Sequence, residues 1–253
     1  MLCVMTWNVL ADAYVKPQYF PTCDPALLVP GVRTRPILSH VAACPADVVC
    51  LQEIEPQVVQ AFRDAGGWDV HFASKVGRPD GCAILARRAV RLANVRTVEF
   101  RDGAPDRQDS GHVALVATVQ VDEGELQIAT THLKWDPPHL KHADRWATRQ
   151  VRDLLALVGD DPVRWIVCGD LNVKPGDPAY RMLVEAGLAD VMPDRPTANA
   201  NGHAKRIDHI LCGRGLETRA LPVLPITDTT PLPSDVMPSD HLPIGVTVEL
   251  ADL

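Results

Sequence analysis

The chain has 253 residues, a length that fits one large domain or two small ones, and it carries a formal net charge of −7. This charge argues against a broad electrostatic grip on duplex nucleic acid, although a metal and a few cations could still hold a small anion or a strand end. No run approaches the roughly 18 apolar residues of a membrane span and no signal-peptide pattern starts the chain, so we expect a soluble, cytoplasmic monomer without a membrane partner.

Short strand-like runs dominate the chain, with a few helical patterns between them. In chain order they predict a strand at Leu2–Asn8, a helix at Arg35–Ala43, a strand at Asp47–Gln52, a helix at Pro56–Ala65, strands at Trp68–Ala73, Cys82–Arg87, Arg91–Phe100, His112–Val121 and Glu125–Leu133, a helix at His139–Val158, a strand at Val163–Cys168, a helix at Pro178–Ala186, and strands at Ile207–Cys212, Glu217–Val223 and Leu242–Leu250. The tripeptide Asp122-Glu123-Gly124 predicts a hairpin turn between two of these strands.

Four irregular segments rich in Pro and Gly interrupt this order, namely Lys16–Pro30, Arg101–Gly111, Met192–Ala204 and Pro225–Pro238. No Ser/Gly linker or repeat divides the chain, and long loops in a compact domain are usually functional. We therefore expect a single catalytic domain over residues 1–253, built from two packed sheets with helices outside.

The seven cysteines are odd in number and contain no Cys-x-x-Cys pair. Most of them lie inside apolar runs such as Val48–Leu51. We expect buried, reduced side chains, with a zinc site or a disulfide framework as the alternative.

Polar side chains repeatedly stand where an apolar run ends or begins. The residues concerned are Asn8, Glu53, His132, Asp170, Asn172, Asp208, Asp240 and His241. Carboxylates are costly to desolvate, so polar groups next to core strands need a reason. The simplest reason is one shared pocket at the edge of a sheet, which holds a divalent metal and a phosphate. The chain is therefore an enzyme candidate.

The segment Gly169–Asn172 places a carboxylate and an amide two residues apart after a buried strand, and such side chains face the same side of an extended backbone. An Asp can accept a proton from water or bind a metal, and an Asn can donate to a phosphate oxygen. A strand-ending Asx turn is the alternative. Asp208 lies inside a strand-like run, where it needs a partner, and His241 is a natural one.

Taken alone, each residue has an ordinary explanation: Glu53 could be solvated, and His132 could be a structural histidine. Their conjunction would require several independent coincidences. Here the chain resembles the metal-dependent endonuclease/exonuclease/phosphatase superfamily, whose fold is like that of DNase I. The matching motifs, in the family's order, are Thr6–Asn8, Leu51–Glu53, Thr131–Leu133, Gly169–Asn172, Arg206–Ile210 and Ser239–His241.

Further segments are similar to the deadenylase-type branch of that family, which includes the CCR4, nocturnin and Angel proteins. These segments are Asn8–Tyr14, Asp80–Ile84, Thr131–Pro137 and Pro238–Leu242. The chain lacks the leucine-rich repeats of many branch members. The loop before Ile207 has no aromatic residue, although polyadenylate-degrading relatives stack a base there, and this difference speaks against adenine specificity.

The resemblance implies an α/β (α+β) four-layer sandwich of two mainly antiparallel sheets with helices outside, and an enzyme that depends on Mg²⁺ or Mn²⁺. Glu53 would be the principal metal ligand, with Asn8 and Asp240 close to the metal. Oxygen-rich ligands suit such hard cations better than zinc.

The resemblance also implies the roles of the catalytic residues. Asp170 would orient or deprotonate the attacking water, and Asn172 would hold water and phosphate in line. His241, paired with Asp208, would donate to the phosphoryl oxygens, and His132 would be a second phosphate contact.

Four further residues are candidates for substrate binding. Lys134 and Trp135 follow His132 and could contact the backbone and a base of the substrate. Arg35 and Lys75 could also touch the substrate. Packing of a loop by Trp135 and solvated surface positions for the two cations are the alternatives.

The sequence therefore predicts a divalent-metal-dependent phosphodiesterase acting on the ends of single-stranded nucleic acid, with 3′-to-5′ exonuclease activity favoured. One alternative is an end-processing phosphatase acting on a 2′,3′-cyclic phosphate or a nucleotide phosphate. The other is a non-catalytic binding module on the same fold.

Overall fold

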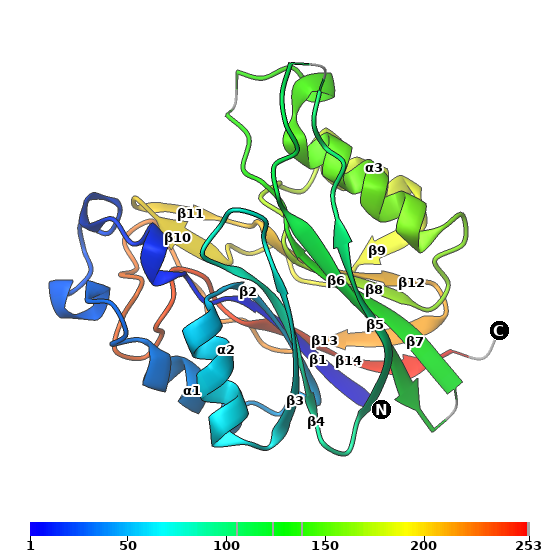
Figure 1. Ribbon diagram of the computed structural model, residues 1–253, viewed down its shortest axis with the longest axis horizontal. Coiled ribbons are helices and arrows are strands. Elements are labelled where there is room, and N and C mark those ends of the chain that lie inside the picture. The colour runs from blue at the N-terminus through cyan, green and yellow to red at the C-terminus, as the bar shows by residue number, and fades with distance from the viewer. Residues whose placement is uncertain (105, 123, 138, 252–253) are drawn as a thin grey trace.

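The computed structural model describes residues 1–104, 106–122, 124–137 and 139–251. Within these residues, two six-stranded sheets lie face to face and four α-helices cover their outer sides (Figure 1). One apolar cluster fills the space between the sheets, and two others lie between each sheet and its helices. The predicted four-layer arrangement is confirmed.

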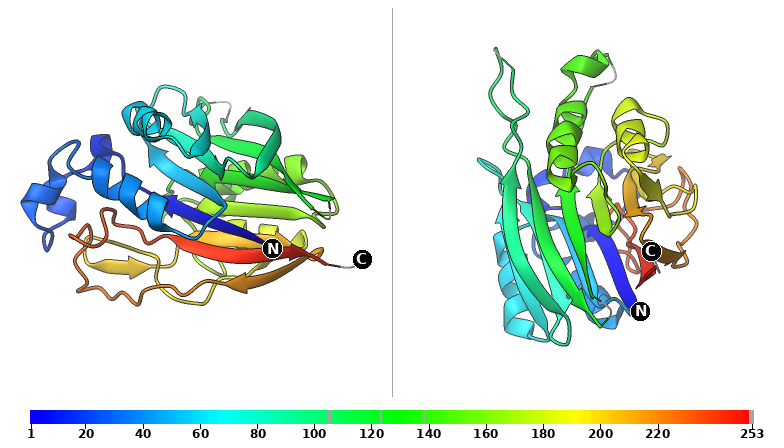
Figure 2. Two further views of the ribbon diagram at one scale, coloured as in Figure 1. Left: turned by 90° about the horizontal axis from the view of Figure 1, so that it is seen from below. Right: turned by 90° about the vertical axis from the view of Figure 1, so that its right-hand side faces the viewer.

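The first sheet contains, in spatial order, β13 (Leu216–Ala220), β14 (Ile244–Leu250), β1 (Leu2–Asn8), β2 (Val48–Ile54), β4 (Gly81–Arg87) and β3 (Trp68–Ser74). Only β1 and β2 are parallel neighbours; the other described pairs are antiparallel. Helices α1 (Thr34–Ala43) and α2 (Pro56–Ala65) cover its outer face. The start of β1 lies beside the end of β14, with Leu2 opposite Val248 (Figure 2).

The second sheet repeats this plan. Its order is β5 (Arg91–Glu99), β6 (Val113–Val121), β7 (Gly124–His132), β8 (Trp165–Asp170), β12 (Asp208–Gly213) and β9 (Leu188–Asp190). Strands β7 and β8 are parallel, and the other described neighbours are antiparallel. Helices α3 (Trp146–Val158) and α4 (Pro178–Glu185) cover its outer face. The prediction of two mainly antiparallel sheets is therefore confirmed.

Alternation along the strands explains why both faces of each sheet are buried. In β1, Val4 faces the core between the sheets, whereas Met5 and Trp7 face the core under α1 and α2. A polar tie joins the two sheets within this core, because Gln52 Nε2 donates to Thr6 Oγ1 and Thr130 Oγ1, both at 2.9 Å. This tie links β2 to β7 close to the ends of both strands.

The two parallel pairs bring four strand ends to one edge of the molecule. Asn8 pairs in register with Gln52, next to Glu53, and His132 pairs with Asp170. Carboxyl ends of parallel strands necessarily lie at the same edge of a sheet. The polar residues that follow these strands therefore meet.

The predicted long helix at His139–Val158 is wrong over its first part. The structure has a 3₁₀ turn, η4 (His142–Asp144), and α3 begins at Trp146. The carboxylate of Asp136 explains this start, because it accepts hydrogen bonds from the backbone N–H groups of Trp146 and Ala147, both at 2.9 Å. A carboxylate there satisfies N–H groups that have no partner inside the helix.

Several short elements were not predicted, most of them in segments that were expected to be irregular. They are β10 (Ala198–Ala200), β11 (His203–Lys205) and the 3₁₀ turns η1 (Asp12–Tyr14), η2 (Pro17–Tyr19) and η3 (Pro25–Leu28). Strand β9 was also not predicted. The antiparallel pairing of β6 with β7 confirms the predicted hairpin, while its central residue Glu123 lies outside the described residues.

The cysteines are reduced and mostly buried, as the sequence predicts. Six of the seven cysteines are buried and Cys44 is half-buried, and all seven are free thiols. Among the described helices, none has the length and apolar character needed to cross a membrane.

Candidate active site

A cavity of about 440 Å³ opens at the edge where the two parallel pairs end. Its lining includes Glu53, His132, Asp170, Asn172, Asp240 and His241. These residues come from segments far apart in the sequence. Glu53, His132 and Asp170 lie at or near the ends of β2, β7 and β8, and Asp240 and His241 precede β14. The structure thus places six of the eight predicted catalytic and metal-binding residues around one cavity.

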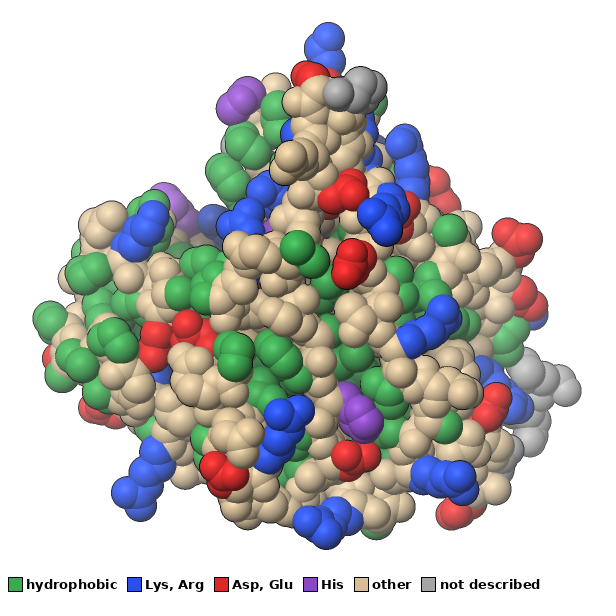
Figure 3. Space-filling model, viewed as in Figure 1, with side chains coloured by type: hydrophobic (Ala, Val, Ile, Leu, Met, Phe, Trp, Pro, Cys, Tyr) green, Lys and Arg blue, Asp and Glu red, His purple; other side chains and the backbone are tan. Residues whose placement is uncertain are grey.

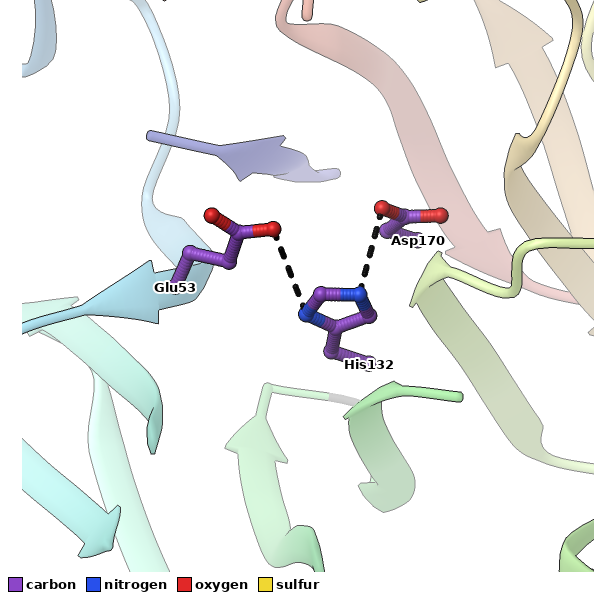
Figure 4. Close-up of side chains that lie close together, drawn as sticks. All are labelled: Glu53, His132 and Asp170. Atoms are coloured by element: carbon purple, nitrogen blue, oxygen red, sulfur yellow. Dashed lines mark ion pairs between the residues drawn. The ribbon is translucent and has the colours of Figure 1, made fainter. Parts of the chain in front are cut away.

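Glu53, His132 and Asp170 form the centre of the site (Figure 4). His132 lies between the two carboxylates, with Nδ1 3.7 Å from Glu53 Oε1 and Nε2 3.5 Å from Asp170 Oδ2. Glu53 reaches this position because the pairing of β2 with β4 skips from Gln52 to Ile54, and its φ is +52°. Such a bulge redirects a side chain away from the regular face of a strand.

Asn8 joins the carboxylates from the two sheets. Its Nδ2 donates to Glu53 Oε1 at 3.0 Å and to Asp170 Oδ2 at 2.9 Å, while its Oδ1 accepts from the backbone N–H of Leu10 at 3.0 Å. Asn8 therefore turns its nitrogen, not its oxygen, toward the cavity carboxylates. In this arrangement Asn8 orients Glu53 rather than offering an oxygen ligand itself.

His241 and Asp208 form a buried pair at the other side of Asp170. Nδ1 of His241 lies 2.9 Å from Asp208 Oδ2, and Thr197 Oγ1 donates to the same oxygen at 2.6 Å. Asp208 is opposite Asp170 in the β12–β8 register. With Nδ1 engaged by Asp208, Nε2 of His241 faces the cavity, 3.7 Å from Asp170 Oδ2. The pairing that the sequence suggested for Asp208 is present.

The loop that carries Asp240 and His241 is fixed to β1. Ser239 Oγ donates to the carbonyl of Asn8 at 2.7 Å, and Trp7 Nε1 donates to the carbonyl of His241 at 2.8 Å. Arg33 adds a second link, because its guanidinium donates to the carbonyl oxygens of Val9, Leu10 and Pro238. These bonds hold both sides of the cavity in one geometry.

Burial and neighbouring charges together raise the pKa values of Asp170 and His241 and lower the pKa of His132. Burial raises the pKa of Asp170 to about 7, and the carboxylates of Asp208 and Glu53 act in the same direction against the charge of His241. Burial opposes the charging of His241, but the carboxylates of Asp208, Asp170 and Asp240 raise its pKa well above the ordinary value. Burial, together with Lys75, lowers the pKa of His132 far below its usual range.

The donor set at the cavity suits a hard divalent cation. Burial raises the pKa values of Glu53 and Asp240, so each carboxylate gains from a positive charge nearby. Oδ1 of Asp240 is buried and has no hydrogen-bond partner within the described residues, which is a position that a cation would satisfy. Carboxylate oxygens are the ligands preferred by Mg²⁺ and Mn²⁺. The residues present therefore fit such an ion.

Three of the four predicted substrate-binding residues line the cavity. Lys134 and Trp135 line the cavity, and Trp135 is 57% exposed, so its ring is open to a ligand. Lys75 also lines the cavity, but it is almost fully buried in an ion pair with Asp80. Arg35 is exposed on α1 and is not among the residues around the cavity.

Several residues at the site were not predicted from the sequence. Arg33 is buried under the cavity, whereas the nearby Arg35 was the residue singled out. Tyr14, His112 and Arg78 line the cavity, and Thr197 supports Asp208. The only sequence signal for this group was that Tyr14 lies in a segment similar to the deadenylase-type branch.

Carboxylates, imidazoles and an amide that converge on one cavity between two sheets define the site type of a metal-dependent phosphoesterase. The model of the Endonuclease/Exonuclease/phosphatase family matches residues 5–241, so the chain belongs to this family. Its members are hydrolases of phosphate esters, which is the enzyme class expected from the sequence.

Individual proteins agree with this family assignment. The chain is 28% identical over 207 residues to protein angel homolog 2 of Danio rerio, covering 75% of this chain and 36% of that protein. The chain thus spans about a third of the length of this relative.

Two solved structures share the fold. A complex of ANGEL2, a 2′,3′-cyclic phosphatase, with adenosine-2′,3′-vanadate matches with a TM-score of 0.81 at 22% identity, over 98% of this chain and 95% of that chain. The human nocturnin catalytic domain with bound sulfate matches with a TM-score of 0.75 at 25% identity, over 99% of this chain and 93% of that chain.

Proposed function

We propose that this protein is a divalent-metal-dependent phosphoesterase that hydrolyses phosphodiester bonds at the ends of single-stranded nucleic acid, as a 3′-to-5′ exonuclease. The observation that carries the proposal is the convergence of Glu53, Asp170, His132 and His241 on one cavity. Membership of the endonuclease/exonuclease/phosphatase family and the similarity to Angel proteins support it. We place the activity in one catalytic domain that comprises residues 1–253.

Asp170 is the proposed base for the attacking water. Its raised pKa of about 7 lies near neutral pH, where a general base combines ionisation with proton affinity. The carboxylate is held from two sides, because Asn8 donates to Oδ2 and the backbone N–H of Asn172 donates to Oδ1, both at 2.9 Å. A base fixed in this way keeps its distance to a bound phosphate constant.

The phosphoryl group is bound by donors that face Asp170 across the cavity. Burial opposes the charging of His241, but the nearby carboxylates raise its pKa, so the ring is protonated at both nitrogens: Nδ1–H donates to Asp208, and Nε2–H is directed at the cavity and can donate to a phosphoryl oxygen. Asn172 and His132 are the further proposed phosphate contacts, and Asn172 Nδ2 lies within hydrogen-bond distance of His132 Nε2, at 2.9 Å. Donors prepared in advance stabilise the negative charge that develops on the phosphoryl oxygens.

A metal ion would be held by Glu53 and Asp240, with Asn8 orienting Glu53. When bound, Mg²⁺ or Mn²⁺ neutralises charge on a nonbridging phosphate oxygen and polarises the phosphoryl group. Chelation should therefore abolish activity.

The surface favours a small or single-stranded ligand over a duplex. On the face shown in Figure 3, Lys and Arg side chains are interspersed with Asp and Glu and form no continuous basic band. The cations at the cavity itself include Lys134, Arg78 and Lys205, next to the exposed ring of Trp135. A few charges and one aromatic platform fit the end of a strand.

The test is product analysis on single-stranded RNA and DNA carrying a label on the 3′-terminal nucleotide. Substrates ending in a 3′-hydroxyl, a 3′-phosphate or a 2′,3′-cyclic phosphate are compared in Mg²⁺ and in Mn²⁺, with Asp170→Ala as the matched control. Release of labelled mononucleotides by the wild type alone supports the exonuclease. Loss or opening of the terminal phosphate without shortening would instead identify an end-processing phosphatase. Equal products from Asp170→Ala, or turnover in excess EDTA, would contradict the proposed mechanism.

A further inference from the structure

A second cavity of about 370 Å³ lies next to the catalytic cavity, on the side of α3 and α4. The two cavities share part of their lining, namely Trp135, Asn172, Lys205 and Ile207. Asn172 is one of the proposed phosphate contacts, so the second cavity begins directly beside the place assigned to the phosphoryl group. A ligand larger than a phosphoryl group could therefore extend from one cavity into the other.

The first turns of two helices form part of the wall of the second cavity. Ala147 and Thr148 belong to α3, and Pro178 and Ala179 belong to α4. The backbone N–H groups of a first helical turn have no partner inside the helix, and this end of a helix carries a partial positive charge. Every helix has this property, so the kind of ligand that the cavity accepts depends on its side chains.

The two carboxylates that line this cavity are already engaged by backbone N–H groups. Asp136 accepts from Trp146 and Ala147, both at 2.9 Å, and Asp177 Oδ2 accepts from Lys174 at 2.7 Å. The lining also contains three cationic side chains, those of Arg145, Lys174 and Lys205. Because cations outnumber carboxylates, the cavity favours a ligand that carries phosphate.

Thr148 supplies an independent indication of a ligand. This residue lines the cavity although it is only 5% exposed, and its Oγ1 has no hydrogen-bond partner within the described residues. A buried hydroxyl without a partner costs free energy, and a threonine in a helix can otherwise bond a carbonyl of the preceding turn. Valine has nearly the same shape and would avoid this cost. The hydroxyl is therefore available to a group that enters the cavity.

The remaining lining of the second cavity is largely apolar. It includes Val173, Ile207 and the ring of Trp135, which is 57% exposed. Apolar walls with a few polar groups suit a nucleoside, because a base has apolar faces and polar edges, and an aromatic ring can stack on it. Lys205 lines both cavities, so it lies where a phosphate attached to such a nucleoside would be.

We propose that the second cavity binds a nucleoside attached to the phosphate in the catalytic cavity, with Thr148 bonding a polar edge of that nucleoside and Lys174 and Lys205 close to its phosphate. This inference rests on the proposed phosphoesterase function and deepens it. It makes the nucleoside, and not the phosphate alone, a group that the protein recognises. Phosphate esters without a nucleoside would leave the second cavity empty and would bind more weakly.

The test compares the binding of inorganic phosphate with that of the dinucleoside monophosphate UpU, which has a nucleoside on each side of its phosphate. Both are titrated calorimetrically in Mg²⁺ in the background of Asp170→Ala, which should not cleave UpU. We expect UpU to bind at least about tenfold more tightly than inorganic phosphate. Adding Thr148→Val should weaken UpU binding about fivefold and change phosphate binding by less than about twofold, because only a hydrogen bond to the nucleoside is lost.

Stability measurements separate a binding role of Thr148 from a structural one. Thr148→Val removes a hydroxyl that bonds none of the described residues, so the midpoint of thermal unfolding should stay the same or rise. Lys174→Met should also weaken UpU binding, and this loss should be larger at low salt than at high salt. The matched control is Arg181→Met, because Arg181 is exposed on α4 and is not among the residues around either cavity. It should change neither affinity.

Three results would overturn the inference. The first is UpU binding no tighter than that of inorganic phosphate. The second is an unchanged UpU affinity in Thr148→Val, which would mean that the hydroxyl binds only an ordered water. The third is an equal weakening of both ligands, which would indicate a disturbed catalytic cavity. All three are read from binding, so they are distinct from failure of the proposed function, which would appear as a lack of turnover by the wild type.

Discussion

Among the described residues, the hydrogen-bonded pairs His241–Asp208 and His209–Asp190 are both buried, and they differ in what contacts the second nitrogen of the histidine. Asp208 and His209 are neighbours on β12 and point to opposite faces of the sheet. Asp208 bonds Nδ1 of His241, whose Nε2 faces the cavity. His209 bonds Asp190 through Nδ1 at 2.9 Å and the carbonyl of Val173 through Nε2 at 2.9 Å.

The difference shows that a buried pair of this type does not by itself mark a catalytic site. Both nitrogens of His209 are occupied by oxygen atoms of the protein, and its ring is fully buried next to Tyr180. His241 has one occupied nitrogen and one that is available to a ligand. Access to the cavity, rather than the presence of a histidine–aspartate pair, distinguishes His241 at the site from the structural histidine His209.

The largest expected effect is a difference in kcat between variants of His241 and His209. We expect His241→Gln to lower kcat by at least roughly 10²-fold, because it removes a prepared donor to the phosphoryl group. His209→Gln should keep kcat within about threefold, because the residue touches no part of the cavity. Steady-state rates per folded molecule decide this. Similar losses in both variants would remove the distinction between the pairs.

Glu53→Gln should weaken metal binding without removing the His241–Asp208 pair. We expect the Mg²⁺ concentration for half-maximal activity to rise at least about tenfold, because a charged oxygen ligand is replaced by a neutral one. The exposed residue Glu217 provides the control, and Glu217→Gln should leave the titration unchanged. An unaltered metal dependence in Glu53→Gln would place the cation elsewhere.

The His209–Asp190 pair should stabilise the fold. We expect His209→Gln to lower the free energy of unfolding by about 2 kcal/mol, because it leaves a buried acceptor at Asp190 or Val173 incompletely satisfied. His203, an exposed histidine of β11, serves for comparison. His203→Gln should change stability by less than about 0.5 kcal/mol in the same urea titration. Equal stabilities of the two variants would argue against a structural role for His209.

The two pairs should respond to pH with opposite sign. Burial raises the pKa of Asp190, but His209 and Arg206 outweigh burial and lower this pKa below its ordinary value of 3.8. The stabilising contribution of Asp190 is therefore present above that pH and is lost as pH falls through the lowered pKa. The pKa of His241 is raised above 6.5, so its contribution is full below that pH and is lost as pH rises through the raised pKa.

Urea titrations in EDTA test these signs. The stability difference between wild type and His209→Gln should shrink as pH falls below 3.8. The difference between wild type and His241→Gln should shrink as pH rises above 6.5. A change in the same direction for both variants would contradict the assigned interactions.

Much of the fold and the residues around the cavity could be predicted because each carries a local signal. Glu53 and Asp170 lie at the ends of apolar runs, near the end of β2 and at the end of β8, and Asp208 is the first residue of β12. Buried strands and the polar residues that end them are visible in a single sequence. The roles given to these residues stay predictions until they are tested.

Other features have no local signal. Arg33 and Arg35 are two residues apart, and Arg33 is buried because three carbonyl groups and the carboxylate of Asp12 bind its guanidinium. The start of α3 depends on Asp136, ten residues earlier. The hairpin of β10 and β11 is stabilised by contacts with other loops, such as the bonds from Asn199 to the carbonyl groups of Thr227 and Thr230. Such features depend on tertiary contacts rather than on propensity.

The central claim is that distant segments build one cavity for a cation and a phosphoryl group. Anomalous diffraction from crystals grown with Mn²⁺ and inorganic phosphate tests it most directly. We predict a manganese peak about 2.2 Å from a carboxylate oxygen of Glu53, with the phosphate within hydrogen-bond distance of His132 and His241. Manganese bound away from Glu53, or a phosphate that touches neither histidine, would contradict the account.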